Sequence, residues 1–107
     1  MMKLDLDEWR EQIKKMDGWT LVDFWSPKWE SSVKLKIEIQ RLESIYGDEI
    51  NFCELDISRA KHLSLRHRFS EVPEVVFYFN GEKKHELSGE VRPIVVHDKI
   101  KEILGIK

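Results

Sequence analysis

Apolar side chains recur along this chain with two different periods, and the change from one period to the other predicts alternating strands and helices. The β-branched and aromatic run Thr20–Trp25 predicts a buried central strand, which Ser26-Pro27 ends. A second strand is predicted at Ile50–Ile57, and a short first strand at Leu4–Asp7.

A β-hairpin and a last helix are predicted in the C-terminal third. Asn80-Gly81 separates Val75–Phe79 from Lys84–Leu87, and Asn-Gly between two such runs is typical of a tight antiparallel turn. The helix follows Pro93, because proline suits the first turn of a helix. We expect it to bury four apolar side chains, namely Val96, Ile100, Ile103 and Leu104.

Two shorter helices are predicted from local signals. The first has Asp7 as its N-cap and ends at Asp17-Gly18. It places three apolar residues on one face: Trp9, Ile13 and Met16. The second spans Arg59–Arg68.

The segment Val33–Gln40 is ambiguous, because its period-two alternation alone predicts a strand. We favour a helix from Ser32 to Tyr46, since the apolar run reaches Gly47 without a turn residue and is longer than most strands. Four apolar residues also share one helical face: Leu35, Ile39, Leu42 and Tyr46. Val33 and Ile37 lie on a second apolar face, which we expect to point outward.

Helices that alternate with strands and precede a hairpin predict an α/β fold with a central sheet covered by helices on both faces. We expect one domain over residues 1–107, with function at the carboxyl ends of the strands. The 18 Lys and Arg nearly balance the 20 Asp and Glu, for a net charge of −2, so bulk attraction to nucleic acid or a membrane is not predicted. The acidic start without a long apolar stretch favours a cytoplasmic protein.

Candidate metal and cofactor chemistry is weak. The four histidines are scattered, with no spacing that favours a metal site, and no nucleotide-binding glycine motif is present. We therefore expect no cofactor. The single cysteine, Cys53, excludes an intrachain disulfide. Ser31 and Ser32 have no motif-placed histidine, so a serine nucleophile is unsupported.

Markers in one order along the chain indicate a family. Asp23-Phe24-Trp25 before a helix resembles the thioredoxin strand that leads into the Trp-Cys-Gly-Pro-Cys site, and Val72-Pro73 resembles the thioredoxin cis-proline loop. Gly89 resembles the glycine after the last strand of that family. The resemblance covers nearly the whole chain and implies a thioredoxin-like fold with a mixed sheet.

The resemblance fails at the reactive thiols. The Cys-x-x-Cys positions fall on Trp29 and Ser32, with Glu30 and Ser31 between them. Dithiol exchange requires an attacking thiolate and a second, resolving thiol, so we expect no thioredoxin-type reductase activity. Any place in cell redox homeostasis is implied by the resemblance alone.

Two carboxyl groups near the expected site, and one thiol far from the site loop in sequence, are further candidate reactive groups. Asp23 matches the buried family aspartate that assists proton transfer, and Glu54 stands where the family often has a lysine. If the two carboxyls approach each other, burial and like charge raise the pKa of at least one. Cys53 lies in the middle of a predicted strand and is expected to be a buried apolar residue; a monothiol redox role is the alternative.

We therefore expect a non-catalytic adaptor or chaperone-like module that binds a protein partner or a second copy of itself. In thioredoxins, the surface next to the cis-proline loop grips substrate chains, and in this chain the matching residues would make that surface more apolar than thiol chemistry requires. The predicted binding residues are Pro27, Trp29, Val33, Ile37, Val72 and Pro73. Binding of RNA or an acidic partner through the basic run Arg59–Arg68 is a further alternative.

Overall fold

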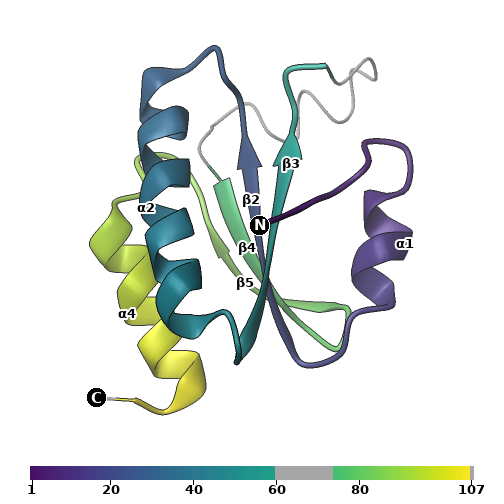
Figure 1. Ribbon diagram of the computed structural model, residues 1–107, viewed down its shortest axis with the longest axis vertical. Helices are drawn as coiled ribbons and strands as arrows, with labels where there is room; N and C mark the ends of the chain where they lie inside the picture. Colours follow the sequence, from purple (N-terminus) through teal and green to yellow (C-terminus); the bar gives the residue numbers. More distant parts are fainter. Residues whose placement is uncertain (60–73, 107) are drawn as a thin grey trace.

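A computed structural model describes residues 1–59 and 74–106 of the chain, and Figure 1 shows their arrangement. The strands are β1 (Met2–Lys3), β2 (Trp19–Trp25), β3 (Ile50–Asp56), β4 (Glu74–Phe79) and β5 (Glu82–Leu87). The helices are α1 (Trp9–Lys14), α2 (Glu30–Tyr46) and α4 (Pro93–Leu104). The predicted helix Arg59–Arg68 falls, from residue 60 onward, outside the described residues, as does Val72-Pro73.

The five strands form one mixed sheet in the order β1-β3-β2-β4-β5. The strands β1, β3 and β2 run parallel, whereas β4 is antiparallel to both β2 and β5. The central strand β2 is nearly all buried, which is why its sequence is a continuous apolar run and not an alternation. The predicted α/β fold with a mixed sheet is confirmed.

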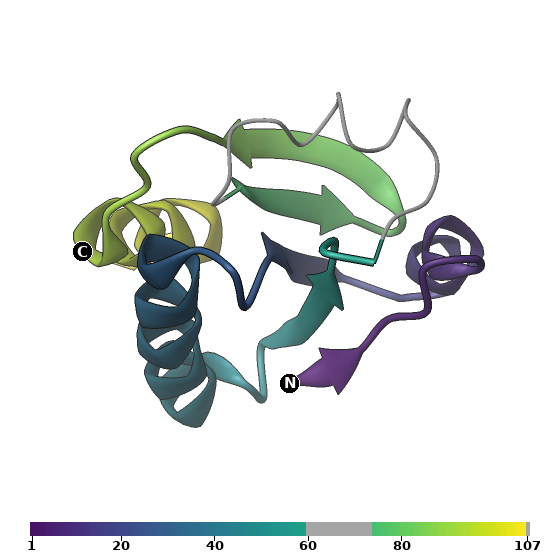
Figure 2. The ribbon, with the colours of Figure 1, turned by 90° about the horizontal axis from the view of Figure 1, so that it is seen from above.

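Helices cover both faces of the sheet, with α1 on one side and α2 and α4 on the other (Figure 2). Successive residues of β2 serve opposite cores because side chains alternate across a strand. Val22 packs with Trp9 and Ile13 beneath α1. Leu21 packs with residues of α2 and α4.

The helical interpretation of the ambiguous segment is confirmed, since α2 buries Leu35, Ile39, Leu42 and Tyr46. The helix begins at Glu30, two residues before the predicted start. The Val33 N–H donates to the Trp29 carbonyl at 3.1 Å, so the first helical hydrogen bond forms earlier than the sequence indicated. In α4, Val96 and Ile100 are fully buried, whereas Ile103 and Leu104 are only half-buried.

The prediction for the N-terminal segment was wrong in detail. The strand is Met2–Lys3, not Leu4–Asp7, because the Leu4 N–H makes the last sheet hydrogen bond and Asp5 then starts a turn. The Asp5 carboxylate accepts from the Asp7 N–H at 2.8 Å, a local bond that competes with strand pairing. The N-cap of α1 is Glu8 instead of Asp7, and it makes no side-chain capping bond. The helix ends at Lys14, before Asp17-Gly18.

The hairpin turn packs closely against α1, and this contact requires Gly81. Gly81 has φ +82°, and a Cβ there would lie 2.9 Å from Lys14 Cα. Gly105 has a similar φ of +69°, but a Cβ there would meet no atom within 4 Å. A side chain at Gly105 would meet backbone strain alone, whereas a side chain at Gly81 would meet both backbone strain and steric overlap with α1.

We predict that Gly81→Ala destabilises the protein more than Gly105→Ala. Both substitutions carry the cost of a left-handed backbone, about 1 kcal/mol, but only Gly81→Ala also pushes the hairpin away from α1. The expected excess is roughly 1–3 kcal/mol in the free energy of unfolding, measured by chemical denaturation. Equal costs for the two variants would show that the close approach is not a constraint.

Candidate functional site

The predicted site lies where the central strand β2 passes into α2. The connection Ser26–Trp29 joins the carboxyl end of β2 to the first turn of α2 (Figure 1). The carboxyl end of a strand in an α/β sheet is the usual location of function. Within this connection and the first helical turn, Pro27, Trp29, Glu30 and Ser31 are exposed to solvent.

Ser32 joins the start of α2 to the Ser26–Trp29 connection by a buried hydrogen bond. Its side chain is fully buried, and its Oγ accepts a hydrogen bond from the Ser26 N–H at 2.9 Å. The Ser26 Oγ in turn accepts from the Lys28 N–H at 3.2 Å. These bonds hold the loop against the helix, so the Ser32 hydroxyl is neither exposed nor paired with a histidine as a nucleophile would be.

An apolar groove of about 470 Å³ runs between α2 and the segment before α4. Its lining residues are Ser31, Lys34, Leu35, Ile37, Glu38, Glu90, Val91, Arg92 and Pro93. Ile37 is 49% exposed and Trp29 is 43% exposed, whereas Val33 is half-buried. The outward orientation predicted for the second face of α2 therefore holds fully for Ile37 and only in part for Val33.

Gly89 shapes the far wall of this groove. It has φ +80°, a conformation that favours glycine, and its carbonyl accepts from the Val91 N–H at 2.9 Å. The resulting tight turn brings Val91 alongside α2. Of the predicted binding residues, the structure places Ile37 in the groove and Trp29 on the exposed junction, while Val72 and Pro73 lie outside the described residues.

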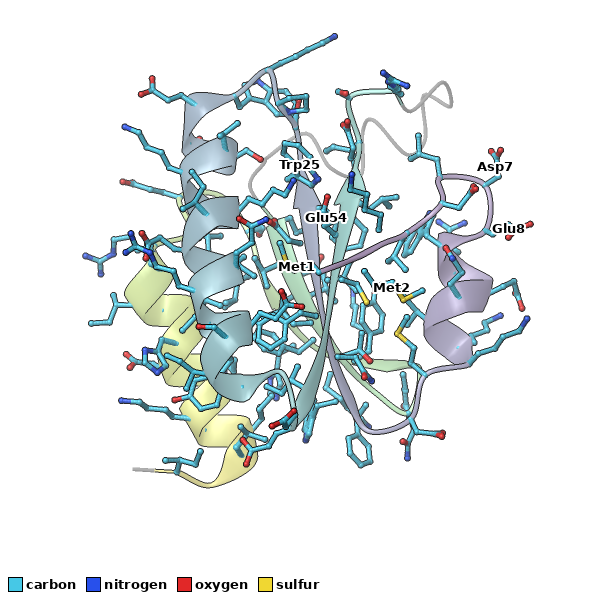
Figure 3. All side chains as sticks on the ribbon, in the orientation of Figure 1. Met1, Met2, Asp7, Glu8, Trp25 and Glu54 are labelled. Atoms are coloured by element: carbon cyan, nitrogen blue, oxygen red, sulfur yellow. The ribbon has the colours of Figure 1, made fainter. Side chains whose placement is uncertain are left out.

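A cluster of charged groups lies buried beneath α2. Asp23 on β2 is fully buried and is in register with Glu54 on β3, which is 5% exposed. The Lys36 Nζ reaches down from α2 to within 3.1 Å of the Glu54 Oε1 and 3.6 Å of the centroid of the Trp25 ring. Figure 3 shows Trp25 and Glu54 side by side next to this helix.

Asp23 is the least satisfied member of this cluster. Burial, and secondarily the nearby Glu54 carboxylate, raise its pKa from 3.8 to about 8, while Lys36 acts in the opposite direction. Neither carboxyl oxygen has a hydrogen-bond partner among the described residues. The prediction that the two carboxyls approach each other and raise at least one pKa agrees with this arrangement. Burial and the neighbouring carboxylate therefore favour the protonated form of Asp23 at neutral pH.

The sequence analysis did not predict that Lys36 belongs to this buried cluster. The alternation of lysines with apolar residues in this segment made Lys36 look like one more solvent-facing charge. Its position one helical turn after Ser32 was the available signal, because residues four apart share a helix face and Ser32 adjoins the strand end. Lys36 thus supplies, from the helix, the cation that pairs with Glu54 on β3.

Cys53 is the neighbour of Glu54 along β3, but its side chain lies on the opposite face of the sheet from this cluster. Its side chain is fully buried in the core beneath α1, with the Sγ 3.7 Å from the Met16 Sδ. Burial raises the pKa of the thiol to about 11. At neutral pH this group is a buried thiol, which supports the expectation of an apolar core residue.

The two histidines that the structure describes, His85 and His97, each contact an aromatic side chain. His85 stacks against Trp19, and the His97 Nε2 lies 2.8 Å from the Tyr46 hydroxyl. Over residues 1–59 and 74–106, no cluster of three or more potential metal ligands occurs. Across the same ranges, no helix is long and apolar enough to cross a membrane.

Comparisons with known proteins agree with this geometry. The family model described as Thioredoxin matches residues 1–102. A thioredoxin of Acetoanaerobium sticklandii is 33% identical over 90 residues, which span 84% of this chain and 86% of that protein. The chloroplastic M-type thioredoxin of Spinacia oleracea is 29% identical over 98 residues, 91% of this chain and 54% of its own length. Thioredoxin f2 of Chlamydomonas reinhardtii shares the fold, with a TM-score of 0.84 at 17% sequence identity. The superposition covers 100% of this chain and 99% of that protein.

The buried acid should make stability depend on pH. Folded Asp23 keeps its proton up to about pH 8, whereas an unfolded aspartate loses it near pH 4, so the folded state binds more protons between these values. Stability should therefore fall as the pH rises from 5 to 8, by roughly 2–4 kcal/mol from this group.

Asp23→Asn should remove that part of the decline. The measurement is the free energy of unfolding by urea at several pH values for both proteins, because the difference between the two curves cancels the titration of the histidines. Parallel curves would contradict the assignment of a protonated Asp23.

Cys53 should resist thiol reagents in the native protein. A pKa of about 11 leaves a thiolate fraction near pH 8 that is about a hundredfold below that of an ordinary cysteine, and burial adds a steric barrier. We expect an aromatic disulfide reagent to label the native protein at least about a hundredfold more slowly than the protein in guanidinium chloride. Equal labelling rates would restore the monothiol alternative.

Proposed function

We propose that this chain, which belongs to the thioredoxin family, is a non-catalytic member that binds a polypeptide through the surface at the start of α2. One observation carries the proposal. The junction of β2 and α2 presents an exposed Trp29, an apolar groove of about 470 Å³ begins two residues later along the chain at Ser31, and the junction contains no thiol.

The absence of thiol chemistry at the junction rests on the sequence and on the position of the one cysteine. Disulfide exchange proceeds by attack of a thiolate on a sulfur atom, with a mixed disulfide as intermediate. Trp29 and Ser32 cannot form such an intermediate. Cys53 is on the other face of the sheet with a raised pKa, so it cannot supply the missing thiol to this site.

The groove suits an extended polypeptide segment. Its walls are rigid, because one is the helix α2 and the other follows the tight turn at Gly89. Apolar lining from Leu35, Ile37 and Val91 favours apolar side chains of a ligand, while Lys34 and Glu38 at the rim can pair with charges of either sign. Exposed tryptophans are enriched among the residues that dominate binding energy, which supports Trp29 as an anchor.

The buried charged cluster supports a change of role at this site. In a catalytic thioredoxin, the buried aspartate assists a proton transfer from a thiol. Here no thiol accompanies Asp23, and the Lys36–Glu54 ion pair joins α2 to β3. This pair helps to hold in place the helix that carries the binding surface.

The first expected result is negative. The purified protein should not accelerate the reduction of insulin by dithiothreitol above the uncatalysed rate, because it lacks an exchangeable thiol at the site. A catalytic thioredoxin assayed in parallel provides the positive control. Turnover by this chain, if it were abolished by Cys53→Ser, would favour the monothiol alternative.

The second test addresses binding directly. Peptides selected from a random library should bind the native protein, and Trp29→Ala with Ile37→Asp should lower their affinity at least about tenfold, measured by fluorescence anisotropy. Ile45→Asp is the matched control, since Ile45 is 64% exposed on the same helix but does not line the groove. It should leave the affinity unchanged within about twofold.

Sedimentation equilibrium on the same variants separates the two kinds of partner. A mass that rises with concentration for the native protein and for Ile45→Asp, but not for the double variant, would identify a second copy as the occupant. Failure to select any peptide, together with a constant monomer mass, would contradict the proposed function.

A further inference from the structure

A second pocket is lined by residues of α1 and of the β4–β5 hairpin, on the other side of the sheet from α2. Figure 1 shows the tip of the hairpin close to α1. The volume of the pocket is about 300 Å³. Its lining residues are Trp9, Arg10, Ile13, Lys14, Tyr78, Gly81 and Lys83. It lies beside the amino end of β2, because Trp19 pairs with Phe79 at the hairpin, whereas the candidate site follows Trp25 at the other end. The length of β2 separates the two by about 20 Å.

The two walls of this pocket are fixed relative to each other. Asn80 in the hairpin turn exchanges two hydrogen bonds with Gly18 in the loop after α1, at 3.0 and 2.7 Å. The close packing of Gly81 on Lys14 adds a steric contact at the same place. A pocket held in this way is formed before any ligand arrives, which lowers the entropic cost of binding.

The floor of the pocket is apolar and partly aromatic. Trp9, Ile13 and Tyr78 are each less than a tenth exposed, and they belong to the core beneath α1. The ring of Trp9 packs edge to face on Phe24, with ring centroids 5.4 Å apart. The floor is therefore rigid and suits a flat apolar body.

The mouth of the pocket is cationic. Arg10, Lys14 and Lys83 line it, and no lining residue carries a carboxylate. The Arg10 guanidinium lies 4.9 Å from the centroid of the Trp9 ring and has no carboxylate within ion-pair distance among the described residues. The pocket thus has three basic side chains at its mouth and apolar side chains beneath them.

Lys14 and Lys83 each form an ion pair at the surface, and these pairs do not prevent either lysine from binding an anionic ligand. Lys14 pairs with Glu11, and Lys83 with Glu86, each three residues away on its own element. All four side chains are substantially exposed, so water screens both pairs and a ligand anion can compete for the ammonium groups. A guanidinium and two ammonium groups offer several charged donors to a carboxylate or phosphate.

We propose that this pocket binds a small aromatic anion, a flat ring that carries a carboxylate or phosphate group. The ring lies on the floor formed by Trp9, Ile13 and Tyr78, and the anionic group faces Arg10, Lys14 and Lys83. The size is suitable, because small-molecule sites begin at roughly 300 Å³. The proposal is independent of the polypeptide surface on α2, since it uses none of the same residues.

The test is a titration of the full chain followed by two-dimensional NMR, with the Gly81 amide and the Trp9 indole N–H as reporters. Phenyl phosphate is the probe, benzyl alcohol supplies the ring without charge, and inorganic phosphate supplies the charge without the ring. Phenyl phosphate should shift both signals to saturation, with a dissociation constant at least about tenfold below those of the other two compounds.

Lys83→Glu should weaken phenyl phosphate binding at least about tenfold, because it places a carboxylate at the mouth. Lys84→Glu is the matched control, since Lys84 is the next residue, pairs with Glu82 at 3.5 Å and does not line the pocket. If Lys83→Glu does not fold, Arg10→Gln provides the same test. Equal effects of the two lysine variants, equal binding of inorganic phosphate, or no saturable shift at Gly81 and Trp9 would each overturn the proposal.

Discussion

The pairing of β2 on both sides is the constraint on which the rest of the structure depends. This strand is parallel to β3 along all seven of its residues and antiparallel to β4 along six. Its side chains alternate between the core beneath α1 and the core beneath α2 and α4, so it aligns both helical layers. Its carboxyl end places Trp29 on the surface, and its amino end meets the hairpin beside the cationic pocket. Both proposed binding surfaces are thus attached to the two ends of one strand.

Buried charge is distributed unusually around this strand. Asp23 is fully buried, and neither of its carboxyl oxygens has a hydrogen-bond partner in the described part of the chain. The neighbouring Glu54 is neutralised from above by Lys36, whose ammonium also lies over the Trp25 ring. Truncation of one partner of such a buried pair leaves the other charge uncompensated, so the three elements that carry these residues are held together by a requirement for charge balance.

Patterns that repeat over several residues made most of the fold predictable from the sequence. The spacing of Leu35, Ile39 and Leu42 identified α2 in spite of a competing strand pattern, and Asn80-Gly81 located the hairpin. Two-residue features were not predictable: β1 is too short to have a period, and the Asp5 side chain formed a turn where a strand was expected. Parts of the site were also hidden, because Ser32 bonds Ser26 in the loop and Lys36 pairs with Glu54 on β3, and the helical spacing of Ser32 and Lys36 does not identify these partners.

The hydrogen bond from the Ser26 N–H to the Ser32 Oγ limits which side chain can occupy position 32. A thiol at position 32 would be a weaker acceptor for the Ser26 N–H than the present hydroxyl, and its larger sulfur would not fit the same fully buried space without movement of the loop. Glu54 and Lys36 would still be arranged for mutual neutralisation and not for proton transfer to a sulfur atom. The pair of substitutions Trp29→Cys and Ser32→Cys would therefore require movement of the Ser26–Trp29 connection and would leave the Lys36–Glu54 ion pair in place. The constraint on position 32 thus comes from the loop and the neighbouring strand as well as from the helix.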